Sequence, residues 1–240
     1  MPGVPSAALL DLRTRLGAAL PAYLRDLEQL VNVDSGTHWK PGVDEVGRWT
    51  GARLRALGAE VRLFPHDTLG DTVSGTFSGA GGPALLLLGH LDTVFPPGTP
   101  AARPFRPTPV VALGPGVTDM KGGLLAGLYA LEAVIAHVGG PDRLPFRRLV
   151  LVATPDEEIG APSSAPHIAA AATGADAALV LEAARADGAI VSSRKGVLDL
   201  AVTVCACGGP GAEADGPGNP IPTAARLVEA LHALPARVAD

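Results

Sequence analysis

Imidazole and carboxylate side chains follow the apolar runs of this 240-residue sequence at several separate places. Borderline divalent metals such as zinc bind imidazole nitrogen and carboxylate oxygen, and a catalytic metal site keeps one position open for water. Several acids gathered at one place would repel one another unless cations lay between them. The candidate metal-site residues are His90, Asp92, Asp119, Glu157, Glu158 and Glu182.

The spacing of these candidates suggests separate roles. The single residue between His90 and Asp92 lets the aspartate accept the free ring N–H and fix the tautomer of a metal-bound imidazole. Glu157 and Glu158 are adjacent and diverge from one turn, so that one can bind metal while its neighbour handles a proton. Both glutamates are needed if one is to bind the metal and the other is to carry the proton.

Each candidate has a simpler explanation when it is taken alone. Asp119 or Asp156 would cap the helix that follows it. A histidine at the end of a strand is more often packed or solvated than a ligand, and Glu182 would be a loop acid. A metal site is favoured only because all of these side chains are expected to converge.

The chain needs parallel strands to bring these residues together. Strand patterns at 59–65, 72–79, 83–90, 147–155 and 175–183 alternate with helix patterns at 9–31, 43–57, 124–138 and 165–172. This alternation predicts an α/β fold with a mainly parallel sheet sandwiched by helices, in which ligands bind outside the carboxyl ends of the strands. The leucine run before His90 predicts a strand buried on both faces, and Gly89 is expected to let the chain leave the sheet.

The last part of the chain has a different character. Residues 197–204 alternate like a strand, residues 205–220 are rich in Gly, Pro and Ala, and residues 223–234 have a helical pattern. We therefore expect one domain over 1–195 and an incomplete second domain over 196–240.

Composition excludes several classes of function. A formal net charge of −5 without a dense run of Lys or Arg predicts binding neither to nucleic acid nor to an anionic membrane. The pair Cys205 and Cys207 supports neither a disulfide framework nor a four-thiolate zinc site. Charges interrupt the apolar N-terminal residues, which argues against a signal sequence or a membrane span and makes the cytoplasm the expected location. The order of residues in "GPGVTDMKGG" fits neither a phosphate-binding loop nor a dinucleotide fingerprint.

The motifs "GHLDTVF", "GPGVTDMKGG", "DEEIG" and "LE", in this order, resemble the glutamate carboxypeptidase, acetylornithine deacetylase and succinyl-diaminopimelate desuccinylase family of zinc metallopeptidases. The resemblance runs from about residue 31 to about residue 204. It implies a zinc exopeptidase-like catalytic domain. The helix in "NPIPTAARLVEAL" resembles the first helix of the family's small α+β dimerisation domain, which implies a homodimer.

The resemblance also implies a role for each candidate. His90 and Glu182 would hold one Zn²⁺, Glu158 would hold a second, and Asp119 would bridge both, with Co²⁺ as an alternative ion. Asp92 would orient His90, and Glu157 would be the general base. The family pattern further implies a cis peptide between Asp119 and Met120.

Two departures from the family pattern concern the second half of the site. The family supplies one more histidine ligand to the second metal near the C-terminal end of a full-length chain, so that the second site is expected to be incomplete in these 240 residues. Pro210 stands where family members carry a histidine that helps to polarise the substrate carbonyl, and proline offers no donor. One hypothesis is a local reading-frame disturbance over residues 205–218, which resequencing would test.

Three functions are compatible with these observations. The first is hydrolysis of an amide bond next to a free carboxylate, such as that of a C-terminal glutamate in a small peptide or acyl-amino acid. The second is an N-acyl amino acid deacylase of the acetylornithine deacetylase type. The third, of a different class, is a catalytically inactive metal-binding or interaction fragment.

Overall fold

The chain forms two compact units, Met1–Ile190 and Val191–Asp240. The computed structural model describes residues 6–194, 196, 200–205 and 219–234. The helices of the first unit are α1 (Ser6–Val31), α2 (Lys40–Ala56), α3 (Thr99–Ala102), α4 (Gly122–Val138) and α5 (Ala165–Ala172), with short helical turns η1 (Val117–Lys121), η2 (Pro141–Arg143) and η3 (Glu157–Ile159). Its strands are β1 (Glu60–Phe64), β2 (Thr72–Phe77), β3 (Ala84–His90), β4 (Arg106–Pro107), β5 (Ala112–Leu113), β6 (Arg148–Thr154) and β7 (Ala177–Val180).

The main sheet has five strands in the order β1-β2-β6-β3-β7. Strand β3 pairs in parallel with β6 and with β7, whereas β2 runs antiparallel to both β1 and β6. Only β2 therefore opposes the direction of the other strands, which confirms the predicted mainly parallel sheet. The connection from β3 to β6 passes through α4, as a parallel pair requires.

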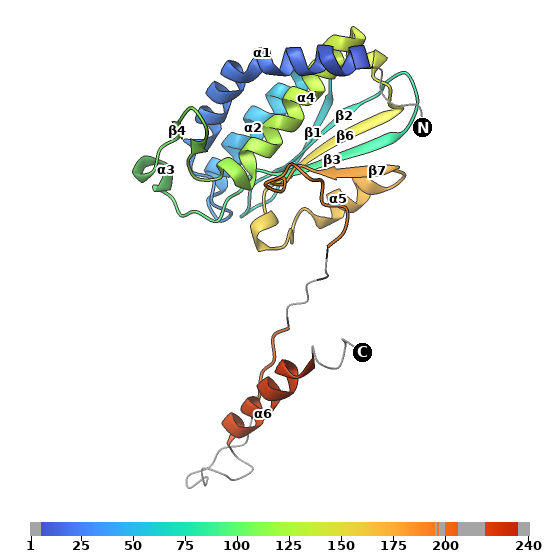
Figure 1. Ribbon diagram of the computed structural model, residues 1–240. Helices are drawn as coiled ribbons and strands as arrows, with labels where there is room; N and C mark the ends of the chain where they lie inside the picture. The colour runs from blue at the N-terminus through green and yellow to red at the C-terminus, as the bar shows by residue number, and fades with distance from the viewer. Residues whose placement is uncertain (1–5, 195, 197–199, 206–218, 235–240) are drawn as a thin grey trace. The chain divides into compact units, whose positions relative to one another are not determined.

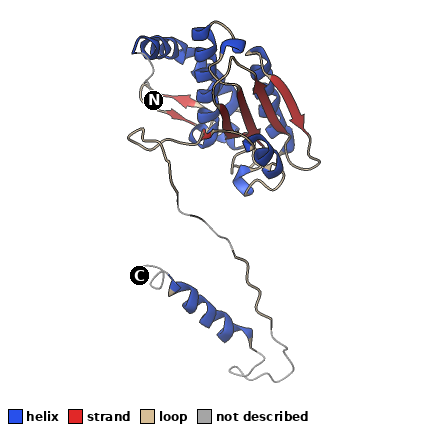
Figure 2. Ribbon diagram, turned by 90° about the vertical axis from the view of Figure 1, so that its right-hand side faces the viewer, coloured by secondary structure: helices blue, strands red, loops and turns tan. Residues whose placement is uncertain are grey.

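Helices cover both faces of this sheet, with α1, α2 and α4 on one face and α5 on the other (Figures 1 and 2). Alternate residues of β3 face the two layers. Leu87 belongs to the core cluster on the side of α1 and α4, and Leu86 packs with Val150 and Val152 in a second cluster on the side of α5. The predicted burial of the leucine strand on both faces is confirmed.

Helix α4 is a core helix with an unusually apolar composition. The stretch Val117–Val138 is long enough to cross a membrane and contains an 18-residue window with a mean hydropathy of 1.2, but half of that window is buried inside the protein. Its side chains Leu124, Leu125 and Leu128 are fully buried, and α4 packs against α1 and β3. Packing in the core accounts for the hydropathy of this helix.

Gly89 has a different role from the one expected. It remains in β3, paired with Ala153, and the chain leaves the sheet only after His90. A Cβ atom at Gly89 would lie 3.0 Å from Cε of Met120 and 3.3 Å from a methyl of Leu124. The glycine therefore makes room for Met120, whose sulfur accepts a hydrogen bond from the backbone N–H of His90 at 3.1 Å.

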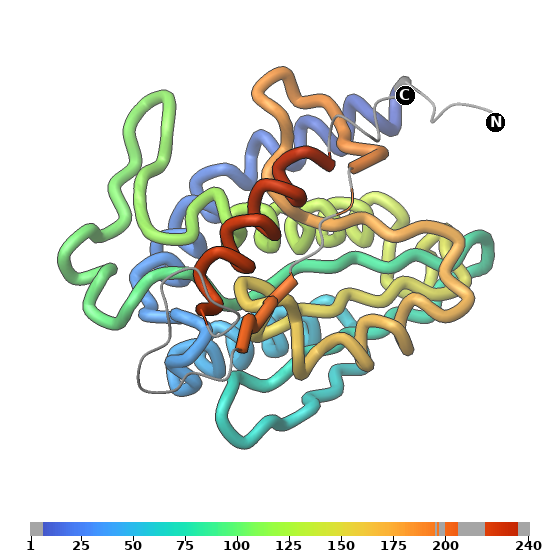
Figure 3. Tube along the Cα trace, turned by 90° about the horizontal axis from the view of Figure 1, so that it is seen from below, coloured from blue at the N-terminus to red at the C-terminus, as the bar shows by residue number. Residues whose placement is uncertain are grey.

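A small hairpin formed by β4 and β5 extends away from the main sheet (green in Figure 3). Its turn exposes Val110, of which 88% is accessible to solvent. The segment lies between β3 and η1, two of the elements that carry candidate site residues.

The second unit contains helix α6 (Pro220–His232), which begins where Asn219 accepts a hydrogen bond from the N–H of Ile221. The strand predicted over 197–204 is wrong for residues 200–204, which have no regular structure. A strand needs a pairing partner, and the described residues of this unit supply none. Residues 197–199 and Pro210 lie outside the described part of the chain, and the second domain's identity as a dimerisation domain stays a prediction.

A buried lysine ties the C-terminal end of α1 to η1. The ammonium group of Lys121 donates hydrogen bonds to the carbonyl oxygens of Leu30, at 2.8 Å, and Val33, at 3.0 Å. Only 1% of Lys121 is exposed. Burial lowers the pKa of Lys121 to about 8, although the charge of Asp34 acts in the opposite direction. A neutral amine still has the two N–H groups that these carbonyls need.

The substitution Lys121→Met should destabilise the fold by about 2 kcal/mol at neutral pH, because the carbonyls of Leu30 and Val33 lose the donor that Lys121 supplies, although the Leu30 carbonyl still accepts the Val33 N–H at 3.2 Å. The folded protein also binds fewer protons at Lys121 than the unfolded chain between pH 8 and 10.5. The free energy of unfolding of the wild type should therefore contain a term from Lys121 that increases with pH in this window. The free energy of unfolding of the variant should not contain this term. Urea denaturation at pH 7, 8 and 9.5 measures both effects.

Arg55→Met, at an exposed position of α2, is the matched control and should change the free energy of unfolding by less than about 0.5 kcal/mol. Equal stabilities of the two variants at all three pH values would refute the role assigned to Lys121.

Candidate metal centre

The six predicted site residues lie at one edge of the sheet, at the carboxyl ends of β3, β6 and β7. His90 is the last residue of β3, and Asp92 follows it. Asp119 lies in η1, which leads into α4, and the turn η3 after β6 contains Glu157 and Glu158. Glu182 follows β7, whose extension is held by a hydrogen bond from the Leu181 N–H to the Leu88 carbonyl at 2.8 Å. The structure brings all six together.

The imidazole of His90 is almost completely buried and faces carboxylates with both nitrogens. Its Nε2 atom lies 2.9 Å from Oδ1 of Asp119, 3.4 Å from Oε1 of Glu182 and 3.9 Å from Oε2 of Glu157. Its Nδ1 atom lies 3.0 Å from the carbonyl oxygen of Asp92 and 3.2 Å from its carboxylate. With the proton on Nδ1, Asp92 orients the ring so that Nε2 can act as a ligand.

Asp92 connects three segments of the site. Its carboxylate is fully buried and accepts a hydrogen bond from the hydroxyl of Thr37 at 2.7 Å. It also accepts the backbone N–H groups of Glu157 and Glu158, each at 3.3 Å. The turn with the two glutamates is thereby held next to His90.

Electrostatics in this cluster favour a bound cation. Burial raises the pKa of Glu158 and of Glu182, and in both cases the negative charge of Asp119 adds to the effect. Burial alone would lower the pKa of His90, but the nearby carboxylates, first that of Asp92, outweigh it and raise the pKa to about 9. The cluster thus retains protons to reduce its own negative charge, and a divalent cation would serve the same purpose.

The donor atoms also fit a metal ion in number and spacing. Two groups of three have ligand atoms within 4.8 Å of one another: His90 with Glu157 and Glu182, and His90 with Asp119 and Glu158. An imidazole with carboxylates is a donor set that suits zinc and similar ions. Glu157, which we expect to act as a general base, therefore also lies where its carboxylate could bind a metal ion.

The backbone at Asp119 has the conformation that the family resemblance implies. The peptide bond between Asp119 and Met120 is cis. Asp119 itself is exposed at its carboxylate, which faces His90. This expectation is confirmed.

Two residues near the site were missed or placed only loosely by sequence reasoning. Thr37 is 55 positions from Asp92 in the chain, and no spacing pattern links the two. Asp156 belongs to the acidic turn but points away from the cluster, fully buried, and accepts hydrogen bonds from Ser163 and Ser164. These bonds outweigh the effect of burial and lower the pKa of Asp156. Ser163 and Ser164 directly precede α5. The simpler explanation that Asp156 caps the next helix is therefore close to its role in the structure.

Comparisons with known proteins show the family to which the chain belongs. Residues 86–238 match the sequence model of peptidase family M20/M25/M40. Carboxypeptidase G2 from Pseudomonas sp. (strain RS-16) is 35% identical over 164 residues, which cover 68% of this chain and 39% of that protein. Succinyl-diaminopimelate desuccinylase from Stenotrophomonas maltophilia (strain R551-3) is 37% identical over 126 residues, 49% of this chain and 31% of that protein. The chain thus spans between 31% and 39% of the length of these curated relatives.

Solved structures show the same fold. Human carnosine dipeptidase 1 superposes with a TM-score of 0.61 at 17% identity, over 72% of this chain and 40% of that one. The metallo-carboxypeptidase Sso-CP2 from Sulfolobus solfataricus gives a TM-score of 0.56 at 19% identity, over 69% of this chain and 38% of that one. The family match over most of the chain, the curated relatives and the shared fold agree with the motifs, and the chain belongs to peptidase family M20/M25/M40.

Proposed function

We propose that the protein acts as a metal-dependent hydrolase that cleaves an amide bond next to a free carboxylate, in the manner of a glutamate carboxypeptidase. The observation that carries this proposal is the buried imidazole of His90 surrounded by the carboxylates of Asp119, Glu157 and Glu182. The similarity to carboxypeptidase G2 supports a substrate with a free carboxylate beside the scissile amide.

We assign two Zn²⁺ ions to this cluster. His90 and Glu182 would hold one and Glu158 the other, with Asp119 as a ligand shared by both, as the family resemblance implies. The donor groups within 4.8 Å of one another are His90 with Glu157 and Glu182, and His90 with Asp119 and Glu158. Bound there, zinc would polarise the scissile carbonyl and lower the pKa of a water molecule to about 7. Asp92 keeps the His90 ring in place for this task.

Glu157 is the proposed general base. Its side chain is about half exposed and its carboxylate lies 3.9 Å from Nε2 of His90, so it can reach both the solvent and the reacting groups. The carboxylate would take a proton from the attacking water and return it to the leaving amine. The hydrogen bond from its backbone N–H to Asp92 fixes the position from which it acts.

One alternative rests on a separate observation. The similarity to succinyl-diaminopimelate desuccinylases, over 49% of this chain, favours an N-acyl amino acid deacylase. The metal-binding or interaction fragment without turnover stays a prediction that the measurements below also test. A homodimer through the second unit is part of the leading proposal.

Glu157→Gln should lower kcat for N-acetyl-L-glutamate by at least about 100-fold, because the amide cannot accept the proton. Zinc affinity, measured by calorimetric titration of the metal-free protein, should stay within a few-fold of the wild type. His90→Ala is the comparison and should lose zinc binding as well as activity.

Loss of zinc binding in Glu157→Gln would instead make Glu157 a ligand, in line with its place beside His90 and Glu182. A wild-type chain that binds zinc tightly and hydrolyses no acyl-glutamate or acyl-ornithine would favour the inactive fragment.

Thr37→Val should weaken zinc binding by about tenfold, because the carboxylate of Asp92 loses the hydroxyl donor that fixes it against His90. The measurement is the same calorimetric titration.

Thr50→Val is the matched control. It removes an equally buried hydroxyl, which donates within α2 to the Val46 carbonyl at 2.9 Å and not to a residue of the cluster. It should leave the zinc affinity unchanged. Equal affinities of the Thr37 variant and the wild type would show that Asp92 does not depend on this bond.

A further inference from the structure

The carboxylate of Asp119 receives little support from its own contacts. Within the described part of the chain, it meets Nε2 of His90 at 2.9 Å, and no other residue donates a hydrogen bond to it. Its side chain is 63% exposed, whereas that of Asp92 is fully buried among donors. The position of the Asp119 carboxylate must therefore be set by the backbone of η1.

The three residues that follow attach η1 to β3 and to α1. The sulfur of Met120 accepts the backbone N–H of His90 at 3.1 Å. The ammonium group of Lys121 binds the carbonyls at the C-terminal end of α1. The carbonyl oxygen of Gly122 accepts a hydrogen bond from the hydroxyl of Tyr23, in the middle of α1, at 3.0 Å. Two of these three attachments thus come from α1, which carries none of the candidate ligands.

The bond from Tyr23 requires a close approach of α1 to the start of α4. A Cβ atom at Gly122 would lie 3.3 Å from the Tyr23 hydroxyl and 2.5 Å from the carbonyl oxygen of Val117. That Val117 carbonyl accepts the N–H of Gly122, which closes the turn η1. Because Asp119 lies inside the turn, its position is linked to that of the Gly122 peptide.

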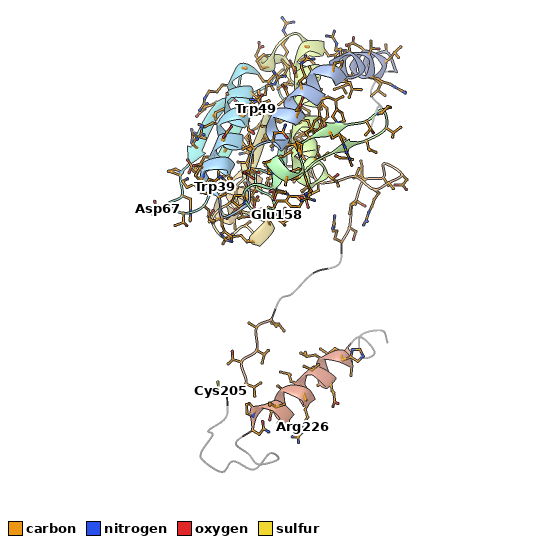
Figure 4. The ribbon with its side chains drawn as sticks, turned by 90° about the vertical axis from the view of Figure 1, so that its left-hand side faces the viewer. Trp39, Trp49, Asp67, Glu158, Cys205 and Arg226 are labelled. Atoms are coloured by element: carbon orange, nitrogen blue, oxygen red, sulfur yellow. The ribbon has the colours of Figure 1, made fainter. Side chains whose placement is uncertain are left out.

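Tyr23 is itself held in place. Its ring meets that of Tyr129 edge-on, with the centroids 5.6 Å apart, and burial raises the pKa of its hydroxyl, which therefore remains a donor at neutral pH. Helix α1 is held in turn by α2, where the indole N–H of Trp49 donates to the side chain of Gln29 at 3.2 Å. Figure 4 shows Glu158 of the cluster at one end of the first unit and Trp49 away from it, further along α2. The hydroxyl of Tyr23 is thus presented by a framework outside the cluster.

We propose that Tyr23 is a positioning residue of the metal centre: its hydroxyl holds the Gly122 carbonyl, and through the turn η1 this bond places the carboxylate of Asp119 against the metal ion. The hydroxyl makes no hydrogen bond to a candidate ligand in the described residues, so its influence passes through the backbone. The proposal rests on the metal binding in the proposed function and not on turnover.

Tyr23→Phe keeps the ring and removes only the hydroxyl. It should weaken zinc binding by about tenfold, because the backbone that carries Asp119 loses one of its attachments. The measurement is calorimetric titration of the metal-free full chain with Zn²⁺.

Tyr129→Phe is the matched control. It removes a hydroxyl that also joins α4 to α1, through a bond to the carboxylate of Asp26 at 2.7 Å, but that bond does not involve η1. Its loss of stability in urea denaturation should be similar to that of Tyr23→Phe, and its zinc affinity should equal that of the wild type. Equal losses of zinc affinity in the two variants would overturn the proposal, since a general loosening of the α1–α4 contact would explain both.

Co²⁺ provides a second measurement that does not depend on affinity. At saturating Co²⁺, the visible absorption reports the arrangement of the ligands around the ion. The spectrum of Tyr23→Phe should differ from that of the wild type, and the spectrum of Tyr129→Phe should match it.

These measurements separate the role of Tyr23 from the proposed function. A chain that shows the expected effects of Tyr23→Phe on Zn²⁺ and Co²⁺ but hydrolyses no acyl-amino acid would keep the role of Tyr23 and refute the hydrolase. A chain that hydrolyses its substrate, with zinc affinity and cobalt spectrum unchanged in Tyr23→Phe, would keep the hydrolase and overturn the role of Tyr23.

Discussion

The buried carboxylate of Asp92 is the interaction on which the arrangement of the site depends. It holds the ring of His90, accepts the hydroxyl of Thr37, and receives the backbone N–H groups of Glu157 and Glu158. These partners belong to three segments that are far apart in the sequence. A buried acceptor with several donors is stable only when all of them are in place, so the carboxylate fixes the segments together. The cluster that faces the solvent is built on this network.

The candidate metal cluster and a pocket of about 480 Å³ beside it share parts of this network. Thr37 donates to Asp92 with its side chain and lines the pocket, and Glu158 contributes both to the pocket and to the cluster. The segments that position the candidate metal ligands therefore also form the walls of this pocket.

Much of this architecture could be predicted from the sequence because its signals are local. The leucines of β3 predicted a strand buried on both faces, and the position of acids after strands predicted their convergence. Long-range contacts left no such signal. The bond from Thr37 to Asp92 and the packing of Met120 over Gly89 join positions 55 and 31 residues apart. The strand expected at residues 200–204 failed because alternation alone cannot supply a pairing partner.

We infer that His90 and the surrounding carboxylates form a zinc centre. X-ray absorption at the zinc edge of the zinc-loaded chain reports the ligand atoms of the bound ion. Nitrogen and oxygen ligands are expected at about 2.0–2.2 Å, with an imidazole contribution that disappears in His90→Ala. A sulfur ligand at about 2.3 Å, which would place the ion at the exposed Cys205 instead, or a spectrum that the His90 substitution leaves unchanged, would contradict it.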